Sequence, residues 1–219
     1  HRFRRAVRST PVRIDELPTE WPWAVGESPF HIKGTAYAFH MEFVREDLPG
    51  GAEAQGEKLG DPALQRFFAQ TFFTTSWYDV WPLIQAGRAC GEVVGAGFER
   101  FVTTRAQHQV ERDLGLVRRV LLRVLSPRAL ALRVPSLNAS YFDFVEVRSQ
   151  ADGQVVSGAC HGLPGPVVRW YQIVTETFIA EVLRRNGAVD HRITWDALEP
   201  DGEAHGVPVF APHFRIALV

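Results

Sequence analysis

Apolar residues in the first half of the chain recur at helical spacing. Between Gly34 and about Glu46 a stripe forms, and His40 projects onto the same face. The apolar members of the stripe are Ala36, Phe39, Phe43 and Val44. Apolar residues spaced by three or four predict an amphipathic helix with one face in a core. The next segment, residues 49–60, is rich in glycine and charge and is expected to form a loop.

Two further helices are predicted from the residues that would begin them. Asp61 followed by Pro62 is a favourable N-cap with proline in the first turn. The apolar stripe of the helix that begins there would be Leu64, Phe67, Phe68 and Phe72. Ser76 followed by Asp79 resembles a capping box for the next helix. That helix would bury Val80, Leu83, Ile84 and Val94.

The clearest helical period lies between Leu114 and Leu125. Its apolar positions are Val117, Val120, Leu121, Val124 and Leu125. Ser126 with Pro127 opens another short helix. We expect Pro135 to end it, because proline lacks the backbone N–H donor and clashes with the preceding turn.

After that helix the apolar period changes from helical to alternating. A hairpin is predicted over residues 142–156, with Asp152 and Gly153 as its turn. A long helix follows over residues 164–186, and Gly187 is placed to stop it.

A second strand pair is predicted at residues 189–198 and 207–218, joined by turn residues at 200–202. Alternating strand and helix units are absent from this order. We therefore expect an α+β fold: an amino-terminal helical layer packed on a twisted antiparallel sheet, made of two strand pairs separated by one long helix.

Residues 1–30 differ from the rest because they are rich in arginine and then in proline. We expect residues 1–30 to be a basic, proline-rich arm and residues 31–219 to be a single domain. The arm also contains Trp21, Trp23 and Phe30, which predict that its later part docks on the domain, since free linkers seldom contain such large apolar groups.

Composition narrows the class of protein. The chain has 219 residues, 46% of them hydrophobic, and a formal net charge of −1, so a globular domain is expected and nucleic acid is not an expected partner. No apolar run is long enough for a membrane span. Cys90 and Cys160 are far apart and suit reduced thiols, which favours a cytoplasmic location.

No catalytic or metal motif is present. The eight histidines show no HExxH or paired-ligand spacing, so we expect no metal site. Cys160 and His161 are neighbours on a predicted strand and would point to opposite faces. No GxSxG sequence occurs, so an enzyme is not the expected class.

The helix at 164–186 is apolar almost all round in its first half. One stripe holds Val167, Tyr171, Val174, Phe178 and Val182, while Trp170 and Ile173 extend the apolar surface to one side. This pattern has three possible causes: burial on two sides in a core, a place in the wall of an apolar pocket, or a subunit interface.

Several stretches resemble a known family. They are IKGTAYAFHMEFV at 32–44, TSWYDVWPLI at 75–84, and GLVRRVLLRVLSPRALALRVPSLNASYFDF at 115–144. Together with the closing helix and strands they resemble domain of unknown function 2378, found chiefly in myxobacteria. That family is distantly similar to the superfamily of haem-based nitric-oxide sensors, 4-vinyl reductase-like domains and Bet3-type subunits.

The resemblance implies helices over a twisted antiparallel sheet, often with an apolar ligand cavity between them, and often a dimer. Haem sensors of that superfamily use a proximal histidine and a Tyr-x-Ser-x-Arg strand motif. This chain has Leu121, Leu122 and Val124 at the first place, and Val145–Arg148 at the second. We therefore expect no cofactor.

The leading hypothesis is a non-enzymatic sensor or binding domain for a small apolar or aromatic ligand, held between the 164–186 helix and the amino-terminal helices. The residues expected to contact it are His40, Phe43, Tyr141, Phe144, Trp170, Tyr171 and Val174. The alternative is a homodimeric interaction or scaffold protein that binds no ligand.

Overall fold

The computed structural model describes residues 11–120, 126–188 and 190–218. Its helices are the 3-10 turn η1 (Ile14–Glu16) and α1 (Gly34–Glu46), α2 (Gly51–Leu59), α3 (Pro62–Phe68), α4 (Trp81–Val93), α5 (Phe98–Val120), α6 (Pro127–Ala139) and α7 (Gly165–Arg185). Its strands are β1 (His31–Lys33), β2 (Trp77–Asp79), β3 (Glu146–Asp152), β4 (Val155–His161), β5 (Leu163–Pro164), β6 (His191–Ala204) and β7 (Val207–Leu218). Among the described helices, none is both long and apolar enough to cross a membrane.

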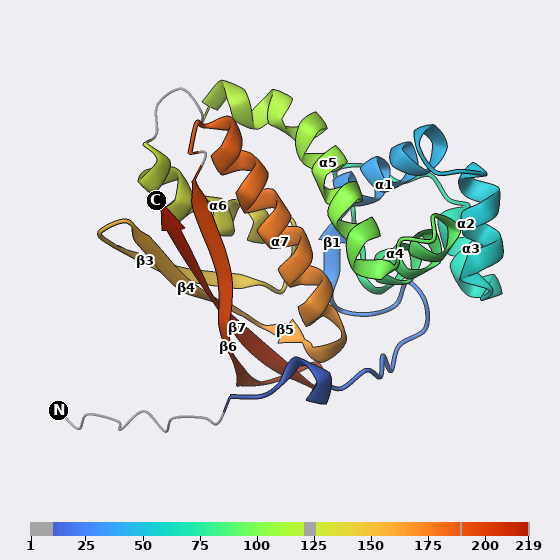
Figure 1. Cartoon of the computed structure of the whole chain (residues 1–219). Coiled ribbons are helices and arrows are strands. Elements are labelled where there is room, and N and C mark those ends of the chain that lie inside the picture. Colours follow the sequence, from blue (N-terminus) through green and yellow to red (C-terminus); the bar gives the residue numbers. More distant parts are fainter. Residues whose placement is uncertain (1–10, 121–125, 189, 219) are drawn as a thin grey trace.

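The carboxyl-terminal half forms a curled antiparallel sheet in which the two strand pairs join. β3 pairs with β4, β4 pairs with β7, and β6 and β5 also pair with β7. The β4–β7 pairing, with Gly158 opposite Phe214, makes one sheet from both hairpins. α6 and α7 contact the sheet and each other, so the main core lies between them and the strands (Figure 1).

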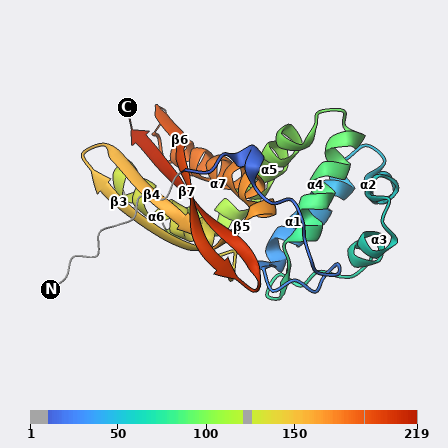
Figure 2. The same cartoon turned by 90° about the horizontal axis from the view of Figure 1, so that it is seen from below.

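The amino-terminal helices lie to one side of the sheet. α5 packs along α7, and α4, α2 and α1 extend from α5 as a helical lobe (Figures 1 and 2). Tyr37 is completely buried in this lobe and stacks on Phe72, with ring centroids 4.6 Å apart. The expected α+β class, helices with an antiparallel sheet of two strand pairs around one long helix, is confirmed.

Residues that favour the start or end of a helix predicted the positions of several helices correctly. The Asp61 carboxylate accepts a hydrogen bond from the Ala63 amide at the start of α3. The Ser126 hydroxyl accepts from the Ala129 amide at the start of α6. The helix expected at 164–186 is α7, and Gly187 adopts a φ of 89° directly after its cap.

The loop expected at 49–60 is wrong, because residues 51–59 form α2. Its Gln55 is 1% exposed and contacts His40, so packing in the lobe holds a helix that the glycine content disfavours. The capping box expected at Ser76 is also wrong. Residues 77–79 form β2, which pairs with β1, and the helix begins at Trp81.

The helix expected at 114–125 is part of a longer one that begins at Phe98, and residues 121–125 lie outside the described residues. The expected end at Pro135 is wrong, because α6 continues through it to Ala139. The Leu132 carbonyl, in the turn before this proline, accepts a hydrogen bond from the Ser149 hydroxyl of β3. A partner from β3 thus satisfies a carbonyl near the proline, and Pro135 is itself buried.

The strand boundaries also differ in two places. β6 runs through 200–202, and the hairpin turns at His205 and Gly206, whose φ angles are 51° and 80°. Irregular pairing between Pro200 and Glu203 absorbs the turn-like residues without ending the strand. β3 starts at Glu146 rather than 142, and Val189 lies outside the described residues.

The described part of the arm packs on the rest of the chain. Trp21 stacks on Trp81 with an interplanar angle of 11° and ring centroids 5.1 Å apart. Phe30 is completely buried and meets Phe144 edge-on. The expected docking of the arm's aromatic residues is confirmed, whereas the division of the chain at residue 30 stays a prediction.

Candidate functional site

The residues expected to contact a ligand lie in two separate clusters. His40 and Phe43 are on α1 in the helical lobe. Trp170, Tyr171 and Val174 are on α7, with Tyr141 and Phe144 on the segment before β3. The structure therefore does not bring all of them to one place.

The α7 cluster is densely packed. Trp170 and Tyr171 are 1% and 0% exposed. Phe142 lies between them, with its ring centroid 6.0 Å from Trp170 and 5.2 Å from Tyr171. Phe142 also meets Phe144 at 5.6 Å. These contacts make the cluster part of the hydrophobic core, and ligand contact there stays a prediction.

His40 belongs to a buried polar cluster on four helices. Its Nε2 lies 2.8 Å from the Gln55 Oε1 on α2. The Cys90 thiol on α4 donates to the same oxygen, and Arg105 on α5 is 3% exposed nearby. Burial, and then the Arg105 charge, lower the pKa of His40 to about 3, against an opposing effect of the Gln55 hydrogen bond. His40 is therefore neutral at pH 7.

Neither cysteine is activated. Burial raises the pKa of Cys90 to about 12 although Arg105 opposes the shift. Burial also raises the pKa of Cys160 to about 12. The neighbouring His161 is bonded to Asp201 at 3.1 Å. Since the thiolate is the reactive form, both cysteines are inert as nucleophiles at neutral pH.

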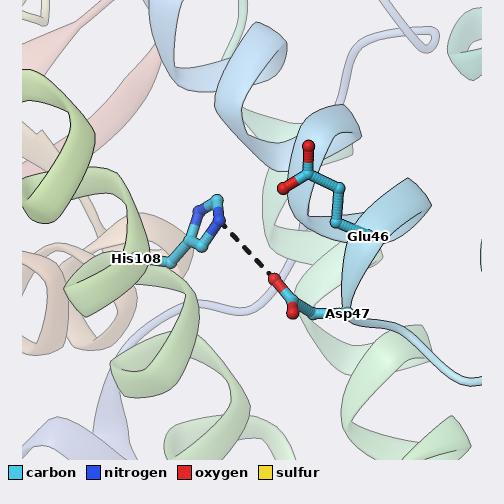
Figure 3. Close-up of side chains that lie close together, drawn as sticks. All are labelled: Glu46, Asp47 and His108. Atoms are coloured by element: carbon cyan, nitrogen blue, oxygen red, sulfur yellow. Dashed lines mark ion pairs between the residues drawn. The ribbon is translucent and has the colours of Figure 1, made fainter.

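Glu46, Asp47 and His108 bring possible metal-ligand atoms within 4.8 Å of one another (Figure 3). The His108 Nε2 lies 3.5 Å from an Asp47 carboxylate oxygen. Arg112 already pairs with Glu46 at 2.5 Å, and its Nε donates to the His108 Nε2 at 3.1 Å. The Arg112 guanidinium is a positive charge beside the possible ligand atoms and would repel a metal cation. This cluster is therefore better explained as an ion-pair network.

A pocket of about 260 Å³ lies where the arm, the start of α7 and the tip of the β6–β7 hairpin meet. We call it the Trp–Pro pocket. It is lined by Pro18, Glu20, Trp21, Pro22, Trp23, Pro164, Gly165, Pro166, Gly206, Val207 and Pro208. In Figure 1 the arm passes below the sheet beside the hairpin tip before it turns towards the helical lobe. A mainly apolar hollow with few polar groups is typical of small-molecule sites.

Aromatic contacts hold the arm side of this pocket. Trp21 meets Trp23 edge-on, with ring centroids 5.1 Å apart and an interplanar angle of 72°. Trp21 also stacks on Trp81 at the start of α4 and meets Phe30 with ring centroids 5.8 Å apart. On the far wall, a Cβ built on Gly165 would lie 2.9 Å from the Pro18 backbone oxygen, so only glycine permits this close approach.

A buried carboxylate fixes the end of the arm. Asp79 is 1% exposed and accepts hydrogen bonds from the Gly26 amide at 3.0 Å and the Ser28 hydroxyl at 2.6 Å. It also accepts from the Trp81 amide at 2.9 Å. Burial raises the pKa of Asp79 while these hydrogen bonds oppose the shift. One side chain thus couples the arm to the first turn of α4, on which Trp21 stacks.

Sequence reasoning did not identify this pocket. The sequence signals for two of its walls are the tryptophans of the arm, predicted to dock on the domain, and the apolar start of the long helix. The third wall, at residues 206–208, was not expected to be near them. Only the folded chain brings these three segments together.

Among the comparisons with known proteins, the one with solved structures found matches. No protein-family model matches the chain, so the resemblance to domain of unknown function 2378 finds no support there, and no curated protein matches it. The structure is similar to one concerned with modulating heme redox potential through porphyrin distortion, with a TM-score of 0.59, 8% identity, and coverage of 85% of this chain and 99% of the other.

Two further similar structures are H-NOX proteins. One is an oxygen-binding H-NOX domain related to soluble guanylate cyclases, with a TM-score of 0.56, 9% identity, and coverage of 85% and 94%. The other is the Fe(II) unliganded H-NOX protein from K. algicida, with a TM-score of 0.56, 11% identity, and coverage of 85% and 96%. The chain therefore has the fold of the H-NOX (haem NO-binding) domains, as the distant part of the expected resemblance implied.

Proposed function

We propose that the protein is a non-enzymatic sensor or binding domain for a small apolar or aromatic ligand, and that the ligand binds in the Trp–Pro pocket. The observation that supports this most directly is the pocket itself. Two tryptophans and five prolines are among its eleven lining residues, so most of its wall is apolar and rigid. A preformed wall favours binding because little side-chain freedom is lost.

The pocket also joins three parts of the chain that lie far apart in the sequence. Its walls come from the arm, from α7 and from the hairpin tip. A ligand that contacts all three would stabilise their mutual position, as any ligand stabilises the state that it binds. A sensor requires such a link between occupancy and conformation.

Haem is the cofactor that the structural neighbours suggest, and the residues of this chain do not fit it. α6 and α7 contain no histidine, and Leu130 and Val134 on α6 and Tyr171 on α7 are completely buried in the core. His40 is completely buried in the helical lobe, bonded to Gln55 and 5.7 Å from the Phe68 ring, so a haem iron has no access to it in this structure. The cysteine thiols are protonated, since burial raises the pKa of each to about 12. We therefore propose a ligand other than haem.

Isothermal titration with benzyl alcohol as a neutral aromatic probe tests the proposal. Trp23→Ala should abolish the heat of binding, because it removes one aromatic wall. Val207→Ala trims a half-buried wall residue and should weaken binding severalfold. The matched control is Trp77→Ala, whose indole is 43% exposed and lies outside the pocket. Equal binding by all four proteins, or no binding to the wild type, would overturn the proposal.

A second function is favoured by one surface feature. Phe73 is 63% exposed and Trp77 43% exposed, and only four residues apart. Exposed large aromatic groups in proximity are typical of protein contacts. Self-association through them would make the homodimer that we expected. Sedimentation velocity of the wild type and of Phe73→Ser tests it: a dimer in the first only would support it, and a monomer in both would refute it.

A further inference from the structure

The walls of the Trp–Pro pocket are poor in hydrogen-bond donors. Five of the eleven lining residues are prolines, which have a carbonyl acceptor but no backbone N–H. The other polar side-chain groups of the lining are the Glu20 carboxylate, which only accepts when ionised, and the indole N–H donors of Trp21 and Trp23. The Trp21 Nε1 is buried and finds no partner in the described part of the chain, so the ring's donor points away from solvent. Acceptors and π-systems thus dominate the surface that a ligand would meet.

The charge of the pocket is also negative. Glu20 is its only charged lining residue, since no lysine, arginine or histidine lines it. Within residues 11–120, 126–188 and 190–218 this carboxylate makes no ion pair. The start of α7 contributes an opposing positive end of about half a charge, and Pro166 removes one of its amide donors. The full negative charge of Glu20 is larger than the half positive charge at the start of α7.

The two tryptophans of the pocket also favour a positively charged ligand. Trp21 and Trp23 both line the pocket and meet edge-on at 72°, while Trp81 covers one face of the Trp21 indole. Tryptophan is the strongest of the aromatic side chains at attracting cations, and quaternary ammonium groups are recognised by aromatic side chains. A quaternary ammonium group also suits apolar walls, because it has no N–H donor and so needs no hydrogen-bond acceptor.

We infer that the Trp–Pro pocket binds a small organic cation, of the quaternary or methylated ammonium class, with Trp21 and Trp23 facing the methyl groups and Glu20 balancing the charge. This inference rests on the proposed function, because it names the ligand class for the same pocket. The volume of about 260 Å³ limits the bound group to a small one.

Choline and its neutral isostere 3,3-dimethyl-1-butanol test the inference, because they differ in charge but hardly in shape. Titrated at low ionic strength, choline should bind about 10-fold more tightly than the isostere. Glu20→Gln should remove most of that difference and leave the affinity for the neutral isostere unchanged. Glu203→Gln, which removes an exposed carboxylate outside the lining, is the control and should behave as the wild type.

The outcomes separate the inference from the proposed function. If the neutral isostere or benzyl alcohol binds and choline binds no better, the inference is wrong while the pocket remains a ligand site. If choline is preferred equally by wild type and Glu20→Gln, the assigned role of Glu20 is wrong. If benzyl alcohol does not bind to the wild type, the proposed function fails, and if choline does not bind either, the inference fails with it.

Discussion

His40 should make the protein sensitive to mild acid. The ring is completely buried, and its Nδ1 finds no partner in the described part of the chain. Protonation would place a second positive charge beside the buried Arg105, which opposes it. The ring must therefore stay neutral in the folded state, whereas an unfolded chain exposes it to water and lets it protonate with an ordinary pKa.

The size of the effect follows from the two pKa values. The pKa of His40 is about 3 in the folded protein and 6.5 in the reference state. Between these values the unfolded chain binds a proton that the folded chain does not, so stability falls as pH falls below 6.5. Each pH unit costs about 1.4 kcal/mol. At pH 4.5 the loss is ~3 kcal/mol, a large part of a typical domain's stability.

Urea denaturation at several pH values between 7 and 4.5 measures this loss. In His40→Gln the buried ring is replaced by a group that does not titrate, so the free energy of unfolding should depend less on pH by ~3 kcal/mol over that range. His213→Gln removes a histidine on the sheet that is over a third exposed, and it should keep the wild-type slope. Equal slopes in His40→Gln and the wild type would refute the reasoning.

The other predictions concern the core, the arm and haem. Trp170→Ala should lower the free energy of unfolding by about 3–5 kcal/mol at every protein concentration, because it empties a packed position; a loss that shrinks with concentration would indicate an interface instead. Asp79→Ala should cost about 1–3 kcal/mol in urea denaturation and weaken binding of benzyl alcohol, because it frees the arm; an unchanged affinity would show that Asp79 does not position the pocket. Titration with haemin should give no Soret band of a ligated haem, and a band that vanishes in His40→Ala or His108→Ala would contradict this.

Elements that depend on local chemistry could be predicted from the sequence. The caps at Asp61 and Ser126 act through the next few residues, so the residue types suffice to locate them. The turn at Asp152 and Gly153 is similarly local, and it closes the β3–β4 hairpin where expected. The apolar stripe at 164–186 predicted a helix covered by a core, a pocket or a second subunit, and Trp170, at 1% exposure, is part of the core.

Elements that depend on distant partners could not be predicted. α2 exists although its glycines disfavour a helix, because Gln55 is held in the lobe by His40. The β6–β7 turn places a non-glycine residue, His205, at positive φ, which local preference argues against. The Trp–Pro pocket is the extreme case, since its walls are more than 180 residues apart between Pro18 and Pro208. No periodicity in one segment reports on the other two.

The position of the bound ligand tests the central proposal most directly. Intermolecular NOEs between the ring protons of benzyl alcohol and the labelled protein identify the side chains that touch the probe. The proposal predicts NOEs to the indole of Trp23 and the methyl groups of Val207, and their loss in Trp23→Ala. NOEs to Trp170 or Tyr171 in place of these would put the ligand within the α7 cluster, and would contradict the Trp–Pro pocket as the binding site.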